Sequence, residues 1–331
     1  MLVLGIDTSC DDTAAAVVEN GHRIISNIVS NQDKIHTKYG GIVPELASRR
    51  HIEMIWPVVD EAMKQAKLDF NDLSAIAVTH GPGLIGSLLV GGCFAKSLAY
   101  VNNLPMVAVN HLEGHIFSTF LEFEPELPFL ALVVSGGHTS IYLVKKIGEY
   151  VEMGRTRDDA AGEAYDKVAK LLGYGYPGGP VIDELASRGN PEAIDFPRAN
   201  LKDSFDFSFS GLKTAVLYHV KKNPEESKED IAASFQSAVT DVLVSRMLEI
   251  AEKKDIKHIA LSGGVSANKH LREMIKEKAS EKKLELYLPS LDLCTDNAAM
   301  IASAGYYRFK YGERANFALN PRAYLPIANM A

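Results

Sequence analysis

Two histidines four residues apart enclose a glutamate in the stretch HLEGH at residues 111–115. An α-helix advances about 100° per residue, so His111 and His115 would lie on one helix face, about 40° apart. Glu113 would project about 200° from His111, on the opposite side. In the zinc-protease pattern H-E-x-x-H, the glutamate directly follows the first histidine and acts as general base. The shifted glutamate removes that base and leaves two histidines that could bind a metal for other chemistry.

A metal held by two imidazoles needs a third ligand, and we expect Asp296 in CTDNAAM (294–300) to supply it. This aspartate stands at the start of the last expected helix. Two imidazoles and one carboxylate leave open coordination positions for substrate oxygens, a ligand set that suits iron or zinc. The spacing by itself equally allows two helical histidines that bind no metal.

Two polar turns, DTSCDDT (7–13) and SGGHT (135–139), each join strands of an expected meander. Gly136 and Gly137 would let backbone amides face an anion with no Cβ in the way. The acidic residues and hydroxyls of the first turn suit a metal or water instead. One such turn alone is more often only a tight turn; two matched turns are equally consistent with a nucleotide-phosphate site.

Further glycine-rich stretches are candidates for close approach to a ligand. GGVSAN (263–268) joins a strand to a helix, whose N-terminus favours negative charge. It is not a Walker A loop, because no lysine follows its last glycine. YGYPGGP (174–180) would by itself be taken as a loop.

The stretch DDAAGEAYDK (158–167) is expected to begin a helix with Asp158 or Asp159 as its cap. Asp166 lies beside the apolar face of that helix, where it could reach a bound amine or hydroxyl. FSFSGLKT (207–214) combines aromatic, small and basic residues, which could contact RNA, form a lid or simply pack.

The order of the expected elements repeats along the chain. Asn20-Gly21 between apolar runs is a strong hairpin signal. A three-strand meander followed by strand–helix units occurs twice, which predicts an α/β fold of two duplicated mixed-sheet lobes. Ligands of such folds bind at turns around a cleft between lobes. The strands are expected at 2–6, 14–18, 22–30 and 75–80, and again at 129–134, 140–144, 150–156 and 258–262.

We expect the N-terminal lobe to comprise residues 1–106 and 297–331, with the last helix, roughly Asn297 to Tyr311, crossing back to it. The C-terminal lobe would be 107–296 and would carry the metal and nucleotide sites. The segment 157–215 fits neither repeat and is expected to be an insertion.

The bulk composition indicates an ordinary globular protein, with 331 residues, 47% hydrophobic and 23% charged. Three cysteines without a CxxC pair favour a reducing compartment. The N-terminus lacks the basic region of a signal peptide, and no apolar run is long enough for a membrane span, so we expect a cytoplasmic protein. The net charge of −7 means that any RNA contact must rest on local basic clusters; the candidates are 49–51, 221–222 and 253–254.

Together these motifs closely resemble the tRNA N6-adenosine threonylcarbamoyltransferase family, the TsaD proteins, formerly described as O-sialoglycoprotein endopeptidases (Gcp). His138 in SGGHT is similar to the bacterial type, while Asp7 and Asp12 stand where bacterial members often carry glutamate. The resemblance extends over nearly the whole chain, through GIDTSCDDT, YGGIVPELASRRH, HGPGLIGSLLVG, NHLEGH, LVVSGGHTS, DDAAGEAYDKVAKLLGYGYPGGP, FSFSGLKT, LSGGVSAN and CTDNAAMIA.

This resemblance implies an actin/Hsp70/sugar-kinase-like (ASKHA) fold. It implies transfer of the threonylcarbamoyl group from threonylcarbamoyl-AMP to N6 of the adenosine 3′ of the anticodon, in tRNAs that read codons starting with A. The implied partners, besides tRNA, are the proteins TsaB and TsaE. The resemblance implies no association with a membrane.

The site residues follow from the same resemblance. The family's metal ligands fall on His111, His115 and Asp296, which would hold one divalent ion: Fe²⁺ foremost, with Zn²⁺ as another possibility and Mg²⁺ with the nucleotide. Its adenylate-binding positions fall on Val133, Val134, Ser135, Gly136, Gly137, Asp166, Gly179, Asp183 and Asn268.

We therefore expect metal-assisted carbamoyl transfer, with the glycine turns holding the nucleotide and Asp166 the threonyl part. The sequence assigns no general base. Two alternatives use the same features: a small-molecule kinase or ATPase on the same fold, which has no use for His111 and His115, and a metallo-endopeptidase, which the position of Glu113 disfavours.

Overall fold

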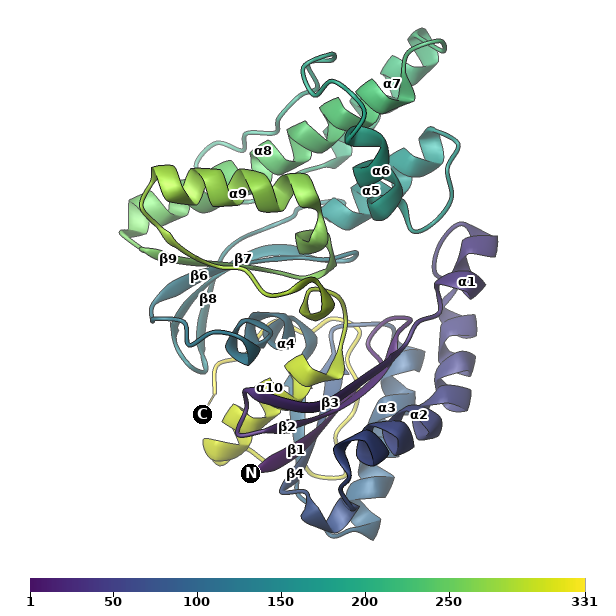
Figure 1. The fold of residues 1–331 in the computed structure, drawn as a ribbon, viewed down its shortest axis with the longest axis vertical. Helices are drawn as coiled ribbons and strands as arrows, with labels where there is room; N and C mark the ends of the chain where they lie inside the picture. The colour runs from purple at the N-terminus through teal and green to yellow at the C-terminus, as the bar shows by residue number, and fades with distance from the viewer. Residues whose placement is uncertain (331) are drawn as a thin grey trace. The chain divides into compact units, whose positions relative to one another are not determined.

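The computed structural model describes residues 1–330 and contains two five-stranded mixed sheets (Figure 1). The strand orders are β3-β2-β1-β4-β5 and β10-β9-β6-β7-β8. In each sheet a three-strand meander opens the unit. The next strand then pairs in parallel with the first strand of that meander, β4 with β1 and β9 with β6. The two sheets therefore have the same topology, and the expected duplicated α/β fold is confirmed.

The first unit contains residues Met1–Pro125, Lys146–Tyr150 and the chain from Asp296 onward. Asn20 and Gly21 both have positive φ, so the predicted Asn-Gly hairpin joins β2 to β3. The elements of this unit are β1 Leu2–Asp7, β2 Thr13–Glu19, β3 Arg23–Ser30, α1 Asp33–His36, α2 Pro44–Ala66, β4 Ala75–Gly81, α3 Ile85–Val101, β5 Met106–Asn110, α4 His111–Phe117 and α10 Ala298–Lys310.

Helices cover both faces of the first sheet. Leu4 and Ile6 of β1 point into the apolar core that α2 completes. On the other face Gly5 lies so close to α10 that a Cβ there would meet Ala302. The last helix therefore belongs to the first unit, as predicted.

The second unit contains residues Glu126–Lys145 and Val151–Thr295. Its core is formed by alternate residues of β6 and β9 with apolar residues of the helices α5, α6, α8 and α9. Its elements are β6 Phe129–Val134, β7 Thr139–Lys146, β8 Glu149–Arg155, α5 Ala161–Leu171, α6 Gly178–Ala186, α7 Ser210–Lys222, α8 Lys228–Lys254, β9 His258–Ser262, α9 Lys269–Glu281 and β10 Glu285–Tyr287.

The division of the structure differs from the expected boundaries in three places. We expected residues 107–125, 146–150 and Asp296 in the C-terminal lobe, but they lie in the first unit; the longest of these segments is 107–125. The physical reason is that β5 extends the first sheet beside β4, and α4 follows it directly and packs on α10. Both metal-ligand candidates of α4 consequently belong to the first unit.

The expected insertion at 157–215 contains α5 and α6 and the start of α7. An isolated bridge between Thr156 and Phe207 holds its two ends together. Among the described residues, no helix is both long and apolar enough to cross a membrane.

Candidate metal centre and nucleotide-binding turns

Helix α4 begins at the first histidine because Asn110, the last residue of β5, caps it. The Asn110 side-chain oxygen accepts hydrogen bonds from the backbone N–H of Leu112 at 2.9 Å and of Glu113 at 3.4 Å. Such a side-chain cap satisfies N–H groups that have no partner within the helix. Every residue of α4 is buried, so its two histidines are held in fixed surroundings.

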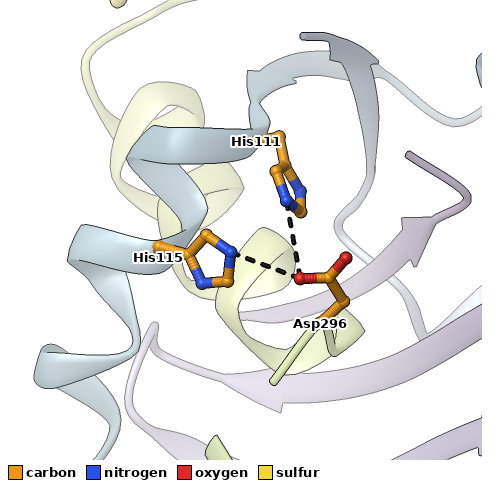
Figure 2. Close-up of side chains that lie close together, drawn as sticks. All are labelled: His111, His115 and Asp296. Atoms are coloured by element: carbon orange, nitrogen blue, oxygen red, sulfur yellow. Dashed lines mark ion pairs between the residues drawn. The ribbon is translucent and has the colours of Figure 1, made fainter. Parts of the chain in front are cut away.

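The two histidines and Asp296 meet at one point (Figure 2). Asp296 Oδ1 lies 3.5 Å from His111 Nε2 and 3.3 Å from His115 Nε2. The three candidate ligand atoms all lie within 4.8 Å of one another. The geometry brings together the three residues that the sequence singled out, and they could hold one metal ion.

The surroundings of the histidines fit a bound cation. Both ring nitrogens of His115 are buried and make no hydrogen bond to any described residue, although Nε2 approaches Asp296. Buried polar atoms are nearly always satisfied, so an additional ligand at this point is expected. Asp7 Oδ2 lies 3.4 Å from His111 Nδ1, in the place where metal-bound histidines often have a carboxylate partner.

The site is strongly acidic. Burial alone would lower the pKa of His111, but the carboxylates of Asp296 and Asp7 outweigh burial and raise it to about 9. Burial, and then Asp296 and Asp11, raise the pKa of Asp12 to about 8. These acids repel one another when ionised, and a divalent cation would relieve that repulsion.

Glu113 faces away from this site, as its position on the helix predicts. Its side chain is fully buried and pairs with Arg308 Nε at 2.6 Å. It also accepts a hydrogen bond from the Tyr150 hydroxyl at 2.9 Å. Because both contacts occupy its carboxylate, Glu113 is not placed to activate a water for peptide hydrolysis.

The turn SGGHT between β6 and β7 has exposed glycines at its tip. Ser135 N donates to His138 O at 2.8 Å and closes the turn. A Cβ on Gly136 or Gly137 would meet no atom within 4 Å, so their backbone is open to a ligand. Val133 and Val134 are fully buried, and only their backbone atoms could take part.

Two neighbouring segments pack tightly on this turn. A Cβ on Gly162, in the first turn of α5, would lie 2.7 Å from both Gly136 Cα and Ser135 O. Gly263 has φ of 90°, and a side chain there would strike the backbone of Val134. These two glycines bring GGVSAN and the start of α5 to the end of β6.

Asp166 belongs to α5, and its carboxylate reaches the start of α6, where Gly179 lies. Asp166 Oδ1 accepts a hydrogen bond from Gly178 N at 2.7 Å, so this oxygen fixes the first turn of α6. A Cβ on Gly179 would meet open space. The role of Asp166 in binding the threonyl part stays a prediction.

Asp183 and Asn268, far apart in the sequence, are in direct contact. Asn268 Nδ2 donates to Asp183 Oδ1 at 3.0 Å and to Gln236 Oε1 of α8 at 2.6 Å. Asn268 Oδ1 accepts from Leu271 N and caps α9. The side-chain amide of Asn268 is therefore occupied by protein partners. Its hydrogen bond to Asp183 holds the Asp183 carboxylate in place.

The expectation that Asp158 or Asp159 caps α5 is wrong, because Ala160 precedes that helix without a side-chain cap. Asp158 instead accepts hydrogen bonds from Phe209 N and Ser210 N at the start of α7. Phe207 and Phe209 are buried and stacked, so the aromatic part of FSFSGLKT is core packing.

The candidate basic clusters differ in exposure and pairing. Arg49 and Arg50 form salt bridges with Glu45 and Glu53 of their own helix, whereas His51 is buried and bonds to Thr13 and Cys10. Lys253 pairs with Glu249. Lys221 and Lys222 are exposed at the end of α7.

Three residues have contacts at the candidate sites that were not predicted from the sequence, although Asp7 was part of a turn whose acidic residues suit a metal. Asp7 could have been placed beside His111, because β1 and β5 flank β4 in one parallel set whose carboxyl ends share an edge. Gln236 is a polar residue at a buried position of α8. Arg308 carries no local signal, since its partner is 195 residues away.

Solved structures with the same fold include HypF in a phosphate- and nucleotide-bound form. This likeness has 16% identity and a TM-score of 0.64, and it covers 94% of this chain and 56% of HypF. The (R)-2-hydroxyglutaryl-CoA dehydratase component A of Acidaminococcus fermentans is 16% identical at a TM-score of 0.55, over 93% and 98% of the two chains. These likenesses support the ASKHA-like fold alone.

Curated relatives match over nearly the full length and are named tRNA N6-adenosine threonylcarbamoyltransferase. One from Thermodesulfovibrio yellowstonii is 58% identical over 99% of this chain and 100% of its own. Another, from Caldicellulosiruptor saccharolyticus, is 48% identical over 99% of both chains.

A sequence model of the family, described as TsaD, tRNA N6-adenosine threonylcarbamoyltransferase, matches residues 23–303. This span includes the three candidate metal ligands and all nine candidate adenylate-binding residues. The chain belongs to the tRNA N6-adenosine threonylcarbamoyltransferase family and is a tRNA-modifying transferase.

Proposed function

We propose that the protein transfers the threonylcarbamoyl group of threonylcarbamoyl-AMP to N6 of the adenosine 3′ of the anticodon, in tRNAs that read codons starting with A. The observation that supports a metal-assisted reaction most strongly is the meeting of His111, His115 and Asp296 within 4.8 Å. In a family of tRNA-modifying transferases, the two histidines of HLEGH would bind a metal for group transfer. This chemistry does not need a glutamate in the position of the protease base.

The ligand set is one that Fe²⁺ accepts well, and Zn²⁺ could occupy it too. When bound, the ion would supply a Lewis acid for the carbamoyl carbonyl. His115 would offer Nε2 to the ion. His111 would also offer Nε2, while Asp7 stands beside Nδ1 and favours the tautomer with its proton there.

The nucleotide would lie against the second unit. The exposed amides at Gly136 and Gly137 suit the phosphate, which is the leaving group of the transfer as AMP. The carboxylate of Asp183, held by Asn268, suits the hydroxyls of a ribose because a carboxylate accepts hydrogen bonds from them. Gly179 leaves room for the donor at the start of α6. Mg²⁺ could accompany the nucleotide.

The proposed protein partners are TsaB and TsaE. Binding of TsaB is supported by exposed apolar side chains on two helices that pack together: Ile52 and Trp56 of α2 with Ile85 and Leu89 of α3. Exposed apolar side chains gathered on neighbouring helices commonly mark a protein interface. We place the reaction in the cytoplasm, where unmodified tRNA would be the acceptor.

Replacing Trp56 by Asp should weaken the complex with TsaB, measured by analytical ultracentrifugation. The control is Tyr218→Asp, which changes an exposed aromatic residue of α7.

A transfer assay tests the proposed reaction. The protein, its partners, Fe²⁺, unmodified tRNA and isotope-labelled threonylcarbamoyl-AMP are incubated, and the tRNA nucleosides are identified by mass spectrometry. We expect the label in threonylcarbamoyladenosine with the unaltered protein and its loss with His111→Ala. His22→Ala changes an exposed histidine and should leave the transfer intact.

The absence of label with every component present would contradict the proposed reaction. Phosphorylation of a small molecule by ATP under the same conditions would support a kinase-like activity instead. Full transfer by metal-free His111→Ala protein would contradict the metal's part alone.

A further inference from the structure

The candidate metal ligands come from two segments that are far apart in the sequence. His111 and His115 belong to α4, whereas Asp296 lies two residues before α10. The distances among their ligand atoms therefore depend on how α4 packs against α10. A displacement of about 1 Å between the helices would change the ligand geometry, and metal and catalytic sites tolerate about 0.5 Å.

Apolar contacts bring α4 and α10 together. A Cβ on Gly114 would lie 2.6 Å from the Ile301 side chain, so the two helices approach closely at this point. Phe117 packs against Tyr307 with ring centroids 5.2 Å apart. Apolar contacts of this kind are non-directional and leave room for sliding and rotation of one helix on the other.

One polar contact between the same two helices is directional. Glu113 lies between the two histidines in sequence, and its carboxylate pairs with Arg308 Nε at 2.6 Å. Glu113 is fully buried and the Arg308 side chain is 8% exposed, so solvent screens this pair only weakly. A buried, hydrogen-bonded ion pair has a defined geometry and can select one arrangement of two packed helices.

The partners of Glu113 and Arg308 are themselves fixed. The Tyr150 hydroxyl donates to Glu113 Oε1 at 2.9 Å. Arg308 also pairs with Glu313 at 2.6 Å and donates to Ala328 O at 3.1 Å. The guanidinium of Arg308 is thus fixed by several contacts. Through Glu113 it is bound to the face of α4 opposite the two histidines.

We propose that Glu113 is a positioning residue of the metal centre. By its contacts with Arg308 and Tyr150 it fixes the rotation of α4 on α10, and this brings both histidines to the carboxylate of Asp296. The inference rests on the metal site of the proposed function. It gives the glutamate of HLEGH a role that requires its place on the helix face opposite the histidines.

Metal binding by the full chain tests this role, with Co²⁺ as the probe because its visible spectrum reports coordination geometry. Glu113→Gln keeps the shape of the side chain and removes its charge. We expect Kd for Co²⁺ to rise about 10-fold, the lower end of the effect of residues that orient metal ligands, and the spectrum of the bound ion to change.

Glu313→Gln is the matched control. It removes a 2.6 Å ion pair from the same arginine but does not touch α4. If the network only stabilises the fold, both variants lower the melting temperature and neither changes the Co²⁺ spectrum. If Glu113 positions the ligands, only Glu113→Gln changes the Kd and the spectrum.

If Glu113→Gln does not fold, a milder variant can be used in its place. Tyr150→Phe removes one hydrogen bond to Glu113 and leaves the ion pair, so a smaller rise in Kd with a shifted spectrum is expected. Unchanged Kd and spectrum in the folded variants, or equal changes in Glu313→Gln, would overturn the inference alone. Co²⁺ binding that survives His111→Ala would overturn the metal site, and the inference with it.

Discussion

The duplicated topology places two turns in equivalent positions, residues 8–12 between β1 and β2 and residues 135–138 between β6 and β7. The first turn is acidic, with Thr8 and Ser9 buried and residues 10–12 half-buried. Thr8 donates to Ser87 O at 2.8 Å and Ser9 N donates to the Asp7 carboxylate at 3.1 Å. The second turn has no acidic residue, and its two glycines are exposed.

The difference lies in the charge that each turn can stabilise. The carboxylates of Asp296 and Asp7 raise the pKa of His111, and those of Asp296 and Asp11 help to raise the pKa of Asp12, so this region favours cations. The backbone N–H groups of the second turn carry partial positive charge and favour anions. One repeated scaffold has therefore diverged into a candidate metal region and a candidate phosphate region. We expect that each region can be changed without altering the other.

The largest effect should come from removing the carboxylate that both histidines face. Asp296→Asn should weaken binding of Co²⁺ by more than about 100-fold, beyond the effect typical of residues that merely orient a ligand. Binding of AMP should stay unchanged, because its candidate residues all lie in the second unit. Isothermal titration with each ligand checks this. An equal loss of AMP affinity would contradict the separation of the two regions.

Much of the fold could be predicted from periodicity and turn chemistry. The strands of both meanders fall within one or two residues of where the apolar runs and turn signals place them. The boundary at residue 106 was misplaced because β5 is only five residues long and its pairing with β4 is a long-range contact. Local patterns carry no information about which sheet such a strand joins.

The candidate sites were predictable to different degrees. His111 and His115 follow from helical spacing, and the structure brings Asp296 to them. In the second unit the residues were identified by resemblance, and the structure adds partners that no local pattern indicates, such as Gln236 bound to Asn268. Asp158 was expected to cap the nearest helix, but it caps α7, about 50 residues away, because the chain returns to it there.

The second prediction concerns the support of the glycine turn. Gly162→Ala would place a methyl group 2.7 Å from backbone atoms of Ser135 and Gly136, which cannot yield as a flexible side chain would. Overpacking of this kind costs about 1–3 kcal/mol. We expect lower stability in urea unfolding and at least several-fold weaker AMP binding.

Gly211→Ala is the control for that change, since Gly211 occupies the same place in the first turn of α7 and a Cβ there meets open space. It should leave stability equal or slightly higher, as alanine favours a helix over glycine. Two variants of equal stability and AMP affinity would show that α5 does not support the turn.

The third prediction is a pH dependence of the acidic turn. Burial, Asp296 and Asp11 raise the pKa of Asp12 from an ordinary value of 3.8 to about 8. The folded protein therefore keeps a proton on Asp12 that the unfolded chain releases, and stability falls as pH rises from about 4 to 8. Asp12→Asn should raise the melting temperature of metal-free protein at pH 8, and the gain should shrink toward pH 4.

Asparagine can still accept the hydrogen bond that Asn31 donates to Asp12 at 3.0 Å. The comparison therefore isolates the charge. Thermal unfolding of both proteins between pH 4 and 8 gives the difference directly, and a difference that does not vary with pH would contradict the raised pKa.

The smallest effect on stability should come from Gly137→Ala at the tip of the second turn. A Cβ at Gly137 meets no atom within 4 Å and the φ angle there is not in the left-handed region, so unfolding should be unchanged. If the phosphate approaches this backbone, the added methyl group occupies its space and AMP affinity falls severalfold. Unchanged AMP affinity in this variant, at unchanged stability, would show that the phosphate binds elsewhere. The two turns would then share their topology, but the proposed contrast between a cation-binding and an anion-binding turn would be wrong.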